Sequence, residues 1–174
     1  MKTTINATRL IPRRIMCLAL SLVAMAALAL RSQAADRQVP FNAAFTTVFV
    51  GEGNFPIDRI TVLGQGQATP LGTATTATTN QLVNLNTGEA TATYTFAAAN
   101  GDTFVVEEKF QSTFDQIARR VTFEGTYVVT GGTGRFAGAT GSGTLSGSAV
   151  FTGPNNGIGS FTLRGTISSP DSLK

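Results

Sequence analysis

The sequence predicts a single all-β domain, either a sandwich or a barrel. Short segments rich in Thr, Ala, Val and Phe recur through residues 41–168, and Gly, Pro and Asn-Gly signals separate them. Regularly spaced short strands with such turns are typical of these two architectures. The expected strands largely lack the Pro and Lys residues that protect exposed sheet edges, which favours a closed barrel. Thr dominates the strands, which disfavours an outer-membrane barrel, because that class needs sustained outward apolar positions.

The expected strands follow from β-propensity and period-two alternation. The clearest alternation places Ala92, Tyr94 and Phe96 on one face of a strand, and Asn100-Gly101 after it is a strong hairpin signal. A bulge or bend is expected at 64–70 and a helical turn within 112–118. The strands are expected at 41–50, 57–63, 71–79, 89–98, 102–110, 119–130, 143–152 and 158–168.

Residues 1–35 have the composition of a signal peptide, which leaves 36–174 as one domain. Basic residues precede an apolar run from Ile15 to Leu30, and Ser32-Gln33-Ala34 offers small residues for cleavage after Ala34 or Ala35. The run is shorter than the roughly twenty residues of a usual membrane span, so an uncleaved anchor is the less favoured alternative. Arg13-Arg14 leaves the general and twin-arginine export routes both open. Export to the periplasm or the exterior is expected, without stable membrane insertion after cleavage.

The mature composition excludes several kinds of chemistry. Five of the thirteen Lys and Arg residues lie in the leader, so the remaining chain has eight basic and ten acidic residues and a net charge of about −2. This charge gives no reason to expect nucleic acid as a partner. The chain has no His, and its one Cys, Cys17, leaves with the leader. Histidine-dependent nucleophilic catalysis and zinc binding through His or Cys are thereby excluded, and no cofactor is expected.

The stretch from Gly125 to Gly143 contains a pattern that resembles a dinucleotide-binding turn. Gly132, Gly134 and Ala137 satisfy the G-x-G-x-x-A spacing after an apolar strand. That motif needs a following helix, whose N-terminus holds the pyrophosphate. Residues 139–144 contain two glycines and two threonines, which disfavour a helix. The sequence therefore predicts a structural β-turn here.

The same turn resembles a known family. Gly-Gly-Thr-Gly-Arg-Phe at 131–136, followed by a Gly-rich strand, is similar to the signature turn of the allene oxide cyclase and dirigent superfamily. The segment 64–72 also resembles one found in small exported bacterial proteins of this type, with Pro70 where His is common. The resemblance covers about residues 41–168 and implies an eight-stranded antiparallel barrel. It implies a cyclase, an isomerase or a dirigent-like protein that steers a reactive hydrophobic substrate inside the barrel.

A non-enzymatic module that binds a small hydrophobic ligand, or a purely structural one, is the preferred function, because catalytic groups are few. Glu108 shares a strand face with Phe104, Val106 and Phe110. If that face is the lumen, burial should raise the pKa of Glu108 and make it a ligand anchor or proton donor. The alternative is a solvated glutamate at a bulge or strand end. Ligand identity and oligomeric state stay open.

Three further residues complete the candidate ligand-binding set. Tyr94 and Tyr127 lie on apolar faces, so their hydroxyl groups either enter a pocket or make one hydrogen bond within the core. Arg135 occupies the signature turn and is expected to cap the barrel end through an ion pair. The candidate set is Glu108, Tyr94, Tyr127, Phe104 and Arg135.

We predict that the exported protein begins at Ala35 or Asp36. The basic residues, the apolar run and the small-residue site together direct signal-peptidase cleavage there. N-terminal sequencing of the secreted or periplasmic product measures this directly. An intact Met1 on protein recovered from the membrane fraction would contradict it.

Overall fold

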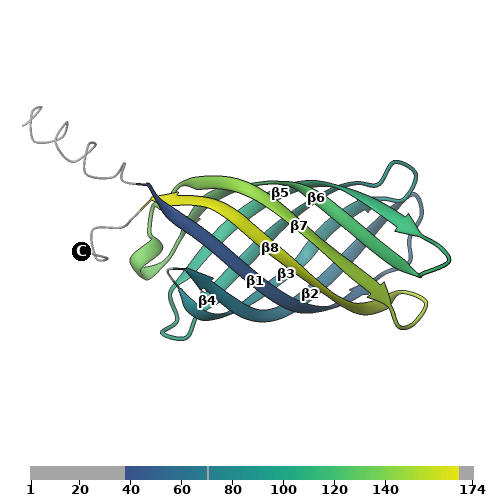
Figure 1. The fold of residues 1–174 in the computed structure, drawn as a ribbon, viewed down its shortest axis with the longest axis horizontal. Helices are drawn as coiled ribbons and strands as arrows, with labels where there is room; N and C mark the ends of the chain where they lie inside the picture. The colour runs from purple at the N-terminus through teal and green to yellow at the C-terminus, as the bar shows by residue number, and fades with distance from the viewer. Residues whose placement is uncertain (1–37, 70, 169–174) are drawn as a thin grey trace, which may run out of the picture. The chain divides into compact units, whose positions relative to one another are not determined.

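The computed structural model describes residues 38–69 and 71–168, whose strands form one closed antiparallel barrel (Figure 1). Each strand pairs with the next, and β8 returns to pair with β1. The eight-stranded barrel expected from the sequence is confirmed, whereas the expected leader at 1–35 lies outside the described residues. The strands are β1 Gln38–Gly51, β2 Ile57–Thr69, β3 Gly72–Asn84, β4 Glu89–Ala98, β5 Thr103–Asp115, β6 Arg120–Gly132, β7 Gly141–Phe151 and β8 Asn156–Ser168.

Alternation along the strands separates a lumen from an outer wall. In β4, the residues Ala90, Ala92, Tyr94, Phe96 and Ala98 are all buried, and the residues between them are more exposed. The outer wall carries mainly Thr, Ser and charged side chains, so the apolar surface that folding removes from water lies inside. In the part of the chain that the structure describes, no helix is long and apolar enough to cross a membrane.

Two local expectations were wrong. Strand β2 continues through 64–69 without the expected bend, and its irregularity lies earlier, between Ile60 and Val62. A Cβ at Gly66 would collide with the Ala44 backbone of β1, so this glycine allows close strand approach and does not mark a bend. Strand β5 runs to Asp115, and a tight turn replaces the expected helical turn at 112–118. The hairpin turn at Asn100-Gly101 is confirmed.

Strand β3 is longer than the expected 71–79 because a bulge interrupts its alternation. Its pairing with β4 shifts between Ala77 and Leu82. Asn80 fills the gap in the ladder: its Oδ1 accepts hydrogen bonds from the Thr78 hydroxyl at 2.8 Å and from the Thr93 amide at 3.2 Å. After the bulge Gln81 lies on the inner face, although a simple two-residue period from Thr78 would place it outside.

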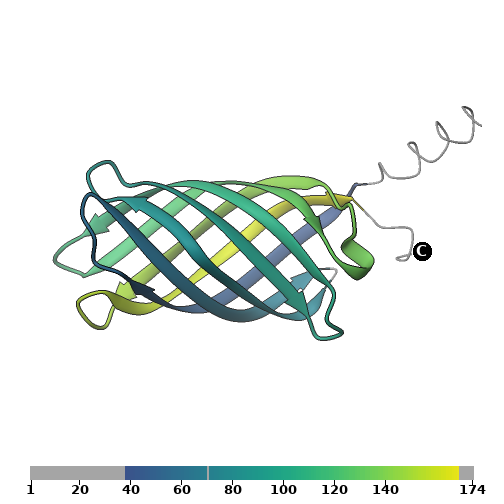
Figure 2. The same ribbon diagram turned by 180° about the vertical axis from the view of Figure 1, so that it is seen from behind.

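One half of the lumen is filled by aromatic side chains. Phe96 and Phe104 stack with ring centroids 4.8 Å apart, and Phe41 meets Phe104 edge-on at 5.2 Å. The short 3-10 helix η1, Gly134–Phe136, closes this end by placing the fully buried Phe136 ring 5.7 Å from Phe104. Strand β1 begins and β8 ends at this closed end (Figures 1 and 2).

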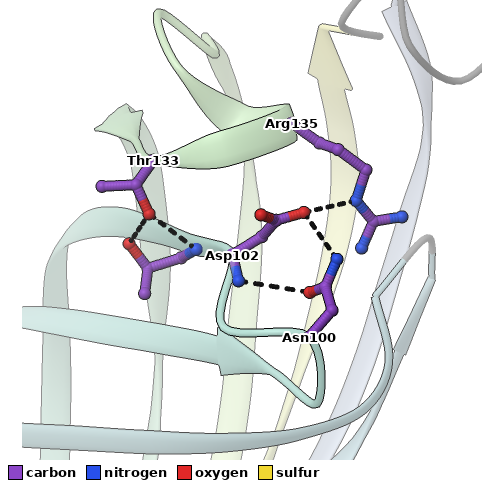
Figure 3. A network of polar contacts seen from close by, with 5 residues as sticks. Asn100, Asp102, Thr133 and Arg135 are labelled. Atoms are coloured by element: carbon purple, nitrogen blue, oxygen red, sulfur yellow. Dashed lines mark hydrogen bonds and ion pairs between the residues drawn. The ribbon is translucent and has the colours of Figure 1, made fainter.

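The turn that holds η1 depends on an ion pair (Figure 3). Arg135 Nε lies 2.6 Å from Asp102 Oδ2, so the expected ion pair is confirmed. Asn100 Nδ2 donates to the same oxygen at 2.8 Å. These hydrogen bonds, first that from Arg135, lower the pKa of Asp102. Because Gly134 has φ +57° and a Cβ there would collide with the Asp102 carboxylate, this glycine is structural. The cluster thus ties the β4–β5 turn to η1, and after η1 the chain continues into another strand, β7, as the sequence predicted.

We expect Gly134→Ala to lower the free energy of unfolding by roughly 1–3 kcal/mol, because the new methyl group must displace Asp102 and disturb its ion pair. Gly138→Ala is the matched control, since Gly138 has φ +73° and open space around a Cβ. It should cost only the backbone strain of about 1 kcal/mol. Urea denaturation measures both variants. Equal losses would show that the contact with Asp102 contributes nothing.

Candidate functional site

The other half of the lumen is a cavity of about 750 Å³. Its lining includes residues of the three turns β1–β2, β3–β4 and β7–β8, so it opens at the end opposite η1. Most of the wall is apolar and aromatic. The apolar residues of the wall include Phe49, Ile60, Val62, Val83, Phe110, Phe123, Ala149, Phe151 and Phe161. Such a barrel interior is wide enough to hold one small ligand.

The aromatic rings of the wall pack in pairs along its sides. Phe49 and Phe151 meet edge-on with centroids 5.1 Å apart, and Phe110 and Phe123 lie 5.5 Å apart. Phe161 stacks on the buried Phe45 at 5.4 Å, and it therefore stands where the filled half begins. These contacts hold the rings against the strands, and the centre of the open half forms the cavity.

Several polar residues, including the buried Asp58, line the cavity, and Tyr94 and Gln81 form a hydrogen-bonded pair among them. The Tyr94 hydroxyl donates a hydrogen bond to Gln81 Oε1 at 2.9 Å, and both residues line the cavity. Burial, followed by the nearby Glu108 carboxylate, raises the pKa of Tyr94 well above its usual range. Tyr94 is therefore a neutral hydrogen-bond donor at any physiological pH, and it fixes the side-chain amide of Gln81.

Glu108 lies inside the barrel, one inward position further toward the closed end than the cavity-lining Phe110. It is 4% exposed, and its Oε1 has no hydrogen-bond partner among the described residues. Burial raises the pKa of Glu108 to about 8, so the side chain is a neutral acid at pH 7. The solvated alternative considered for this residue is excluded by its burial.

Tyr127 is the cross-strand neighbour of Glu108 on β6. Its hydroxyl is buried and likewise has no hydrogen-bond partner within the described barrel. Burial, and then Glu108, raise the pKa of Tyr127 to about 12. The ring fits inside because Gly143 and Gly165 face it: a Cβ at either glycine would meet Tyr127 at 2.7 Å. Two unsatisfied polar groups thus lie side by side on neighbouring strands, next to the filled core.

The structure separates the sequence-derived candidates along the barrel axis. Tyr94 lines the cavity, Tyr127 and Phe104 lie in the filled half, Glu108 lies where the two halves meet, and Arg135 lies in the closing turn. Sequence reasoning missed Gln81, which the bulge turns inward, and the wall residues Phe123 and Phe161. The two phenylalanines each stand between polar neighbours, Thr122 and Glu124 or Ser160 and Thr162, and that signal could have placed them inside.

The described residues offer no assembly suited to a metal ion: no three His, Cys, Asp or Glu side chains gather within 38–69 and 71–168. A second hollow, of about 1170 Å³, is lined chiefly by hydroxyl and amide side chains of the outer wall, such as Thr46, Gln67 and Ser146. Those residues are exposed to solvent. The lumenal cavity is therefore the better candidate for an apolar ligand.

Comparisons with known proteins give one structural similarity and assign no family. The closed eight-stranded antiparallel barrel is the architecture implied by the resemblance to the allene oxide cyclase and dirigent superfamily. Among solved structures, the chain is similar to the pterocarpan synthase dirigent protein GePTS1, with a TM-score of 0.44 and 14% identity over 79% of this chain and 90% of that one. No protein-family model and no curated protein matches the sequence.

We expect stability to fall as pH rises from about 5 to about 8, because Glu108 retains its proton in the folded state while the unfolded chain, with an ordinary pKa of 4.5, releases it. In this range the folded state binds one more proton, so each pH unit costs about 1.4 kcal/mol. The stability that the Glu108 proton contributes is present in full below pH ~4.5. It declines above that pH and is lost once pH passes the folded-state pKa of about 8. Urea denaturation at a series of pH values measures the slope.

Glu108→Gln removes the titrating group and should flatten this slope. Glu107→Gln is the matched control, because Glu107 is the preceding residue on the exposed outer face and should leave the slope unchanged. If Glu108→Gln and the wild type show the same pH dependence, Glu108 does not hold the proton that links pH to folding.

Proposed function

We propose that the protein, exported in its mature form, binds one small hydrophobic molecule in the open half of the barrel. The observation that carries this proposal is the cavity of about 750 Å³ with its mainly apolar wall. Ligand pockets typically have volumes of about 300–1,000 Å³ and combine apolar walls with a few polar groups. A purely structural barrel of this size can fill its lumen with side chains, as the closed half does.

The polar pair in the wall supports a ligand that is hydrophobic and carries at least one hydrogen-bonding group. Gln81 Oε1 is occupied by Tyr94, and the amide nitrogen of Gln81 makes no hydrogen bond to any residue that the structure describes. That nitrogen is available to donate to a carbonyl, ether or hydroxyl oxygen. A ligand oxygen placed there would satisfy the amide while its apolar body contacts the aromatic wall.

A second candidate function is that of a cyclase or steering protein. Glu108 favours it, because a neutral carboxylic acid in an apolar interior can donate a proton or a hydrogen bond at pH 7. Glu108 is not among the cavity-lining residues, so a substrate would reach it only if the side chains between them moved. Non-enzymatic binding needs no such movement and is therefore the function that we prefer.

We expect the purified protein to bind the neutral fluorophore N-phenyl-1-naphthylamine and to increase its fluorescence. Ala149→Phe should abolish most of this increase, because Ala149 lines the cavity and a phenyl ring there would occupy it. Ser146→Phe on the exposed outer face of the same strand is the matched control and should bind as the wild type does. Absence of binding by the wild type, or equal binding by Ala149→Phe, would contradict the proposal.

Native mass spectrometry of protein purified from its own host then separates the two candidate functions. A binding protein should carry a hydrophobic molecule that is released unchanged. A steering protein or cyclase should convert the recovered molecule or its precursor, and Glu108→Gln should stop the conversion without preventing binding.

A further inference from the structure

Large apolar side chains project into solvent around the open end of the barrel. Phe55 of the β1–β2 turn is 73% exposed, Leu85 of the β3–β4 turn 51%, Phe114 at the end of β5 52%, and Ile117 of the β5–β6 turn 98%. We call these four residues the apolar rim. Burial of such side chains is ordinarily favourable, and a group of them around one opening marks an interaction surface.

The rim is continuous with the cavity. Phe55, Leu85 and Phe114 are more than half exposed, and the same three residues line the cavity wall. The apolar surface of these three side chains is therefore continuous with the cavity wall, and polar residues such as Asn86 and Thr113 line the mouth beside them. The closed end has a different surface, since its turns contain none of the strongly exposed large apolar residues within 38–69 and 71–168.

We propose that the apolar rim docks on the surface of a lipid bilayer, with the cavity mouth facing the acyl chains. This inference rests on the proposed function: docking would let a hydrophobic ligand enter or leave the cavity without passing through water. The side chains of the rim would insert shallowly, in the manner of an interfacial protein, while the strands stay outside the hydrocarbon core.

The area and layout of the rim favour a lipid surface over a second copy of the chain. Its side chains expose on the order of 500 Å² of apolar surface, taking about 150–250 Å² for a large buried side chain. A stable protein interface usually buries about 800 Å² on each partner. The rim also consists of separate protrusions from three different hairpins, β1–β2, β3–β4 and β5–β6. A fluid bilayer accommodates such protrusions without a complementary rigid surface.

Charge contributes little to this surface. The Asp115 carboxylate accepts hydrogen bonds from the Ile117 and Ala118 amides, and the Arg119 guanidinium donates to the Gly153 carbonyl. Exposed acids and bases beside the rim balance, three of each: Glu52, Glu89 and Asp115 against Arg59, Arg119 and Arg120. Docking should therefore depend on apolar insertion, and it should need no anionic lipid and resist high salt.

The test is co-flotation of the purified protein with phosphatidylcholine vesicles. The wild type should float with the vesicles at low and at high salt. The double variant Phe55→Ser/Ile117→Ser should partition at least about tenfold less, because it loses the two most exposed side chains of the rim. Val128→Ser is the matched control: Val128 is 53% exposed but lies on the outer wall of β6, and its loss should change nothing.

Each other outcome overturns the proposal. A wild type that does not float excludes lipid docking, and if sedimentation shows a dimer that the rim variant dissociates, a second copy is the occupant instead. If the rim variant and Val128→Ser lose flotation equally, the outer wall of the barrel, and not the rim, contacts the lipid. Loss of flotation at high salt replaces apolar insertion with charge attraction.

Binding of N-phenyl-1-naphthylamine in vesicle-free solution separates this proposal from the proposed function. The rim variant should still bind the fluorophore, which also shows that it is folded. A wild type that floats but does not bind the fluorophore would remove the proposed function and leave the docking. A wild type that binds the fluorophore but does not float would remove the docking and leave the proposed function.

Discussion

The pairing of β1 with β8 is the constraint on which the rest of the structure depends. The two strands are in register from Gln38 opposite Ser168 to Val50 opposite Asn156. This pairing removes both edges of the sheet, so the ladder needs no protecting loop or charged edge strand. It also fixes the width of the lumen, because strand number and stagger together set the barrel diameter. Without cysteine in the barrel, the closed hydrogen-bond ladder and the packed core stabilise the fold.

Packing divides the lumen into two parts with different properties. In the filled half, large rings lie over small residues of adjacent strands, as Tyr127 of β6 does over Gly143 of β7 and Gly165 of β8. In the open half, rings such as Phe110 and Phe123 pack against each other along the wall. Glu108 lies where the two parts meet, and its unsatisfied oxygen is a cost that the surrounding core offsets. A buried polar group retained at such a cost is typical of a functional site.

Much of the fold could be predicted from sequence because turn residues and alternation are local signals. They placed most strands near their observed positions and put Glu108 on one face with Phe104, Val106 and Phe110, which the structure shows to be the inner face. Alternation gives the face of a residue but not its level along the barrel axis, which depends on register with distant strands. The sequence therefore could not separate Tyr94, in the cavity wall, from Phe104, in the filled half. Gln81 escaped prediction because the bulge at 77–82 reverses the alternation on which such predictions rest.

The pairing of Gln38 with Ser168 determines which connections of the barrel can change in sequence and length. The strand ends that connect to the rest of the chain lie together at one end, so every connection at the mouth is an ordinary hairpin between sequential strands. Such hairpins can change in length and composition without disturbing the ladder. New ligand preferences can therefore arise at the mouth independently of folding, while a circular permutation that joins these two strand ends would preserve every strand pair.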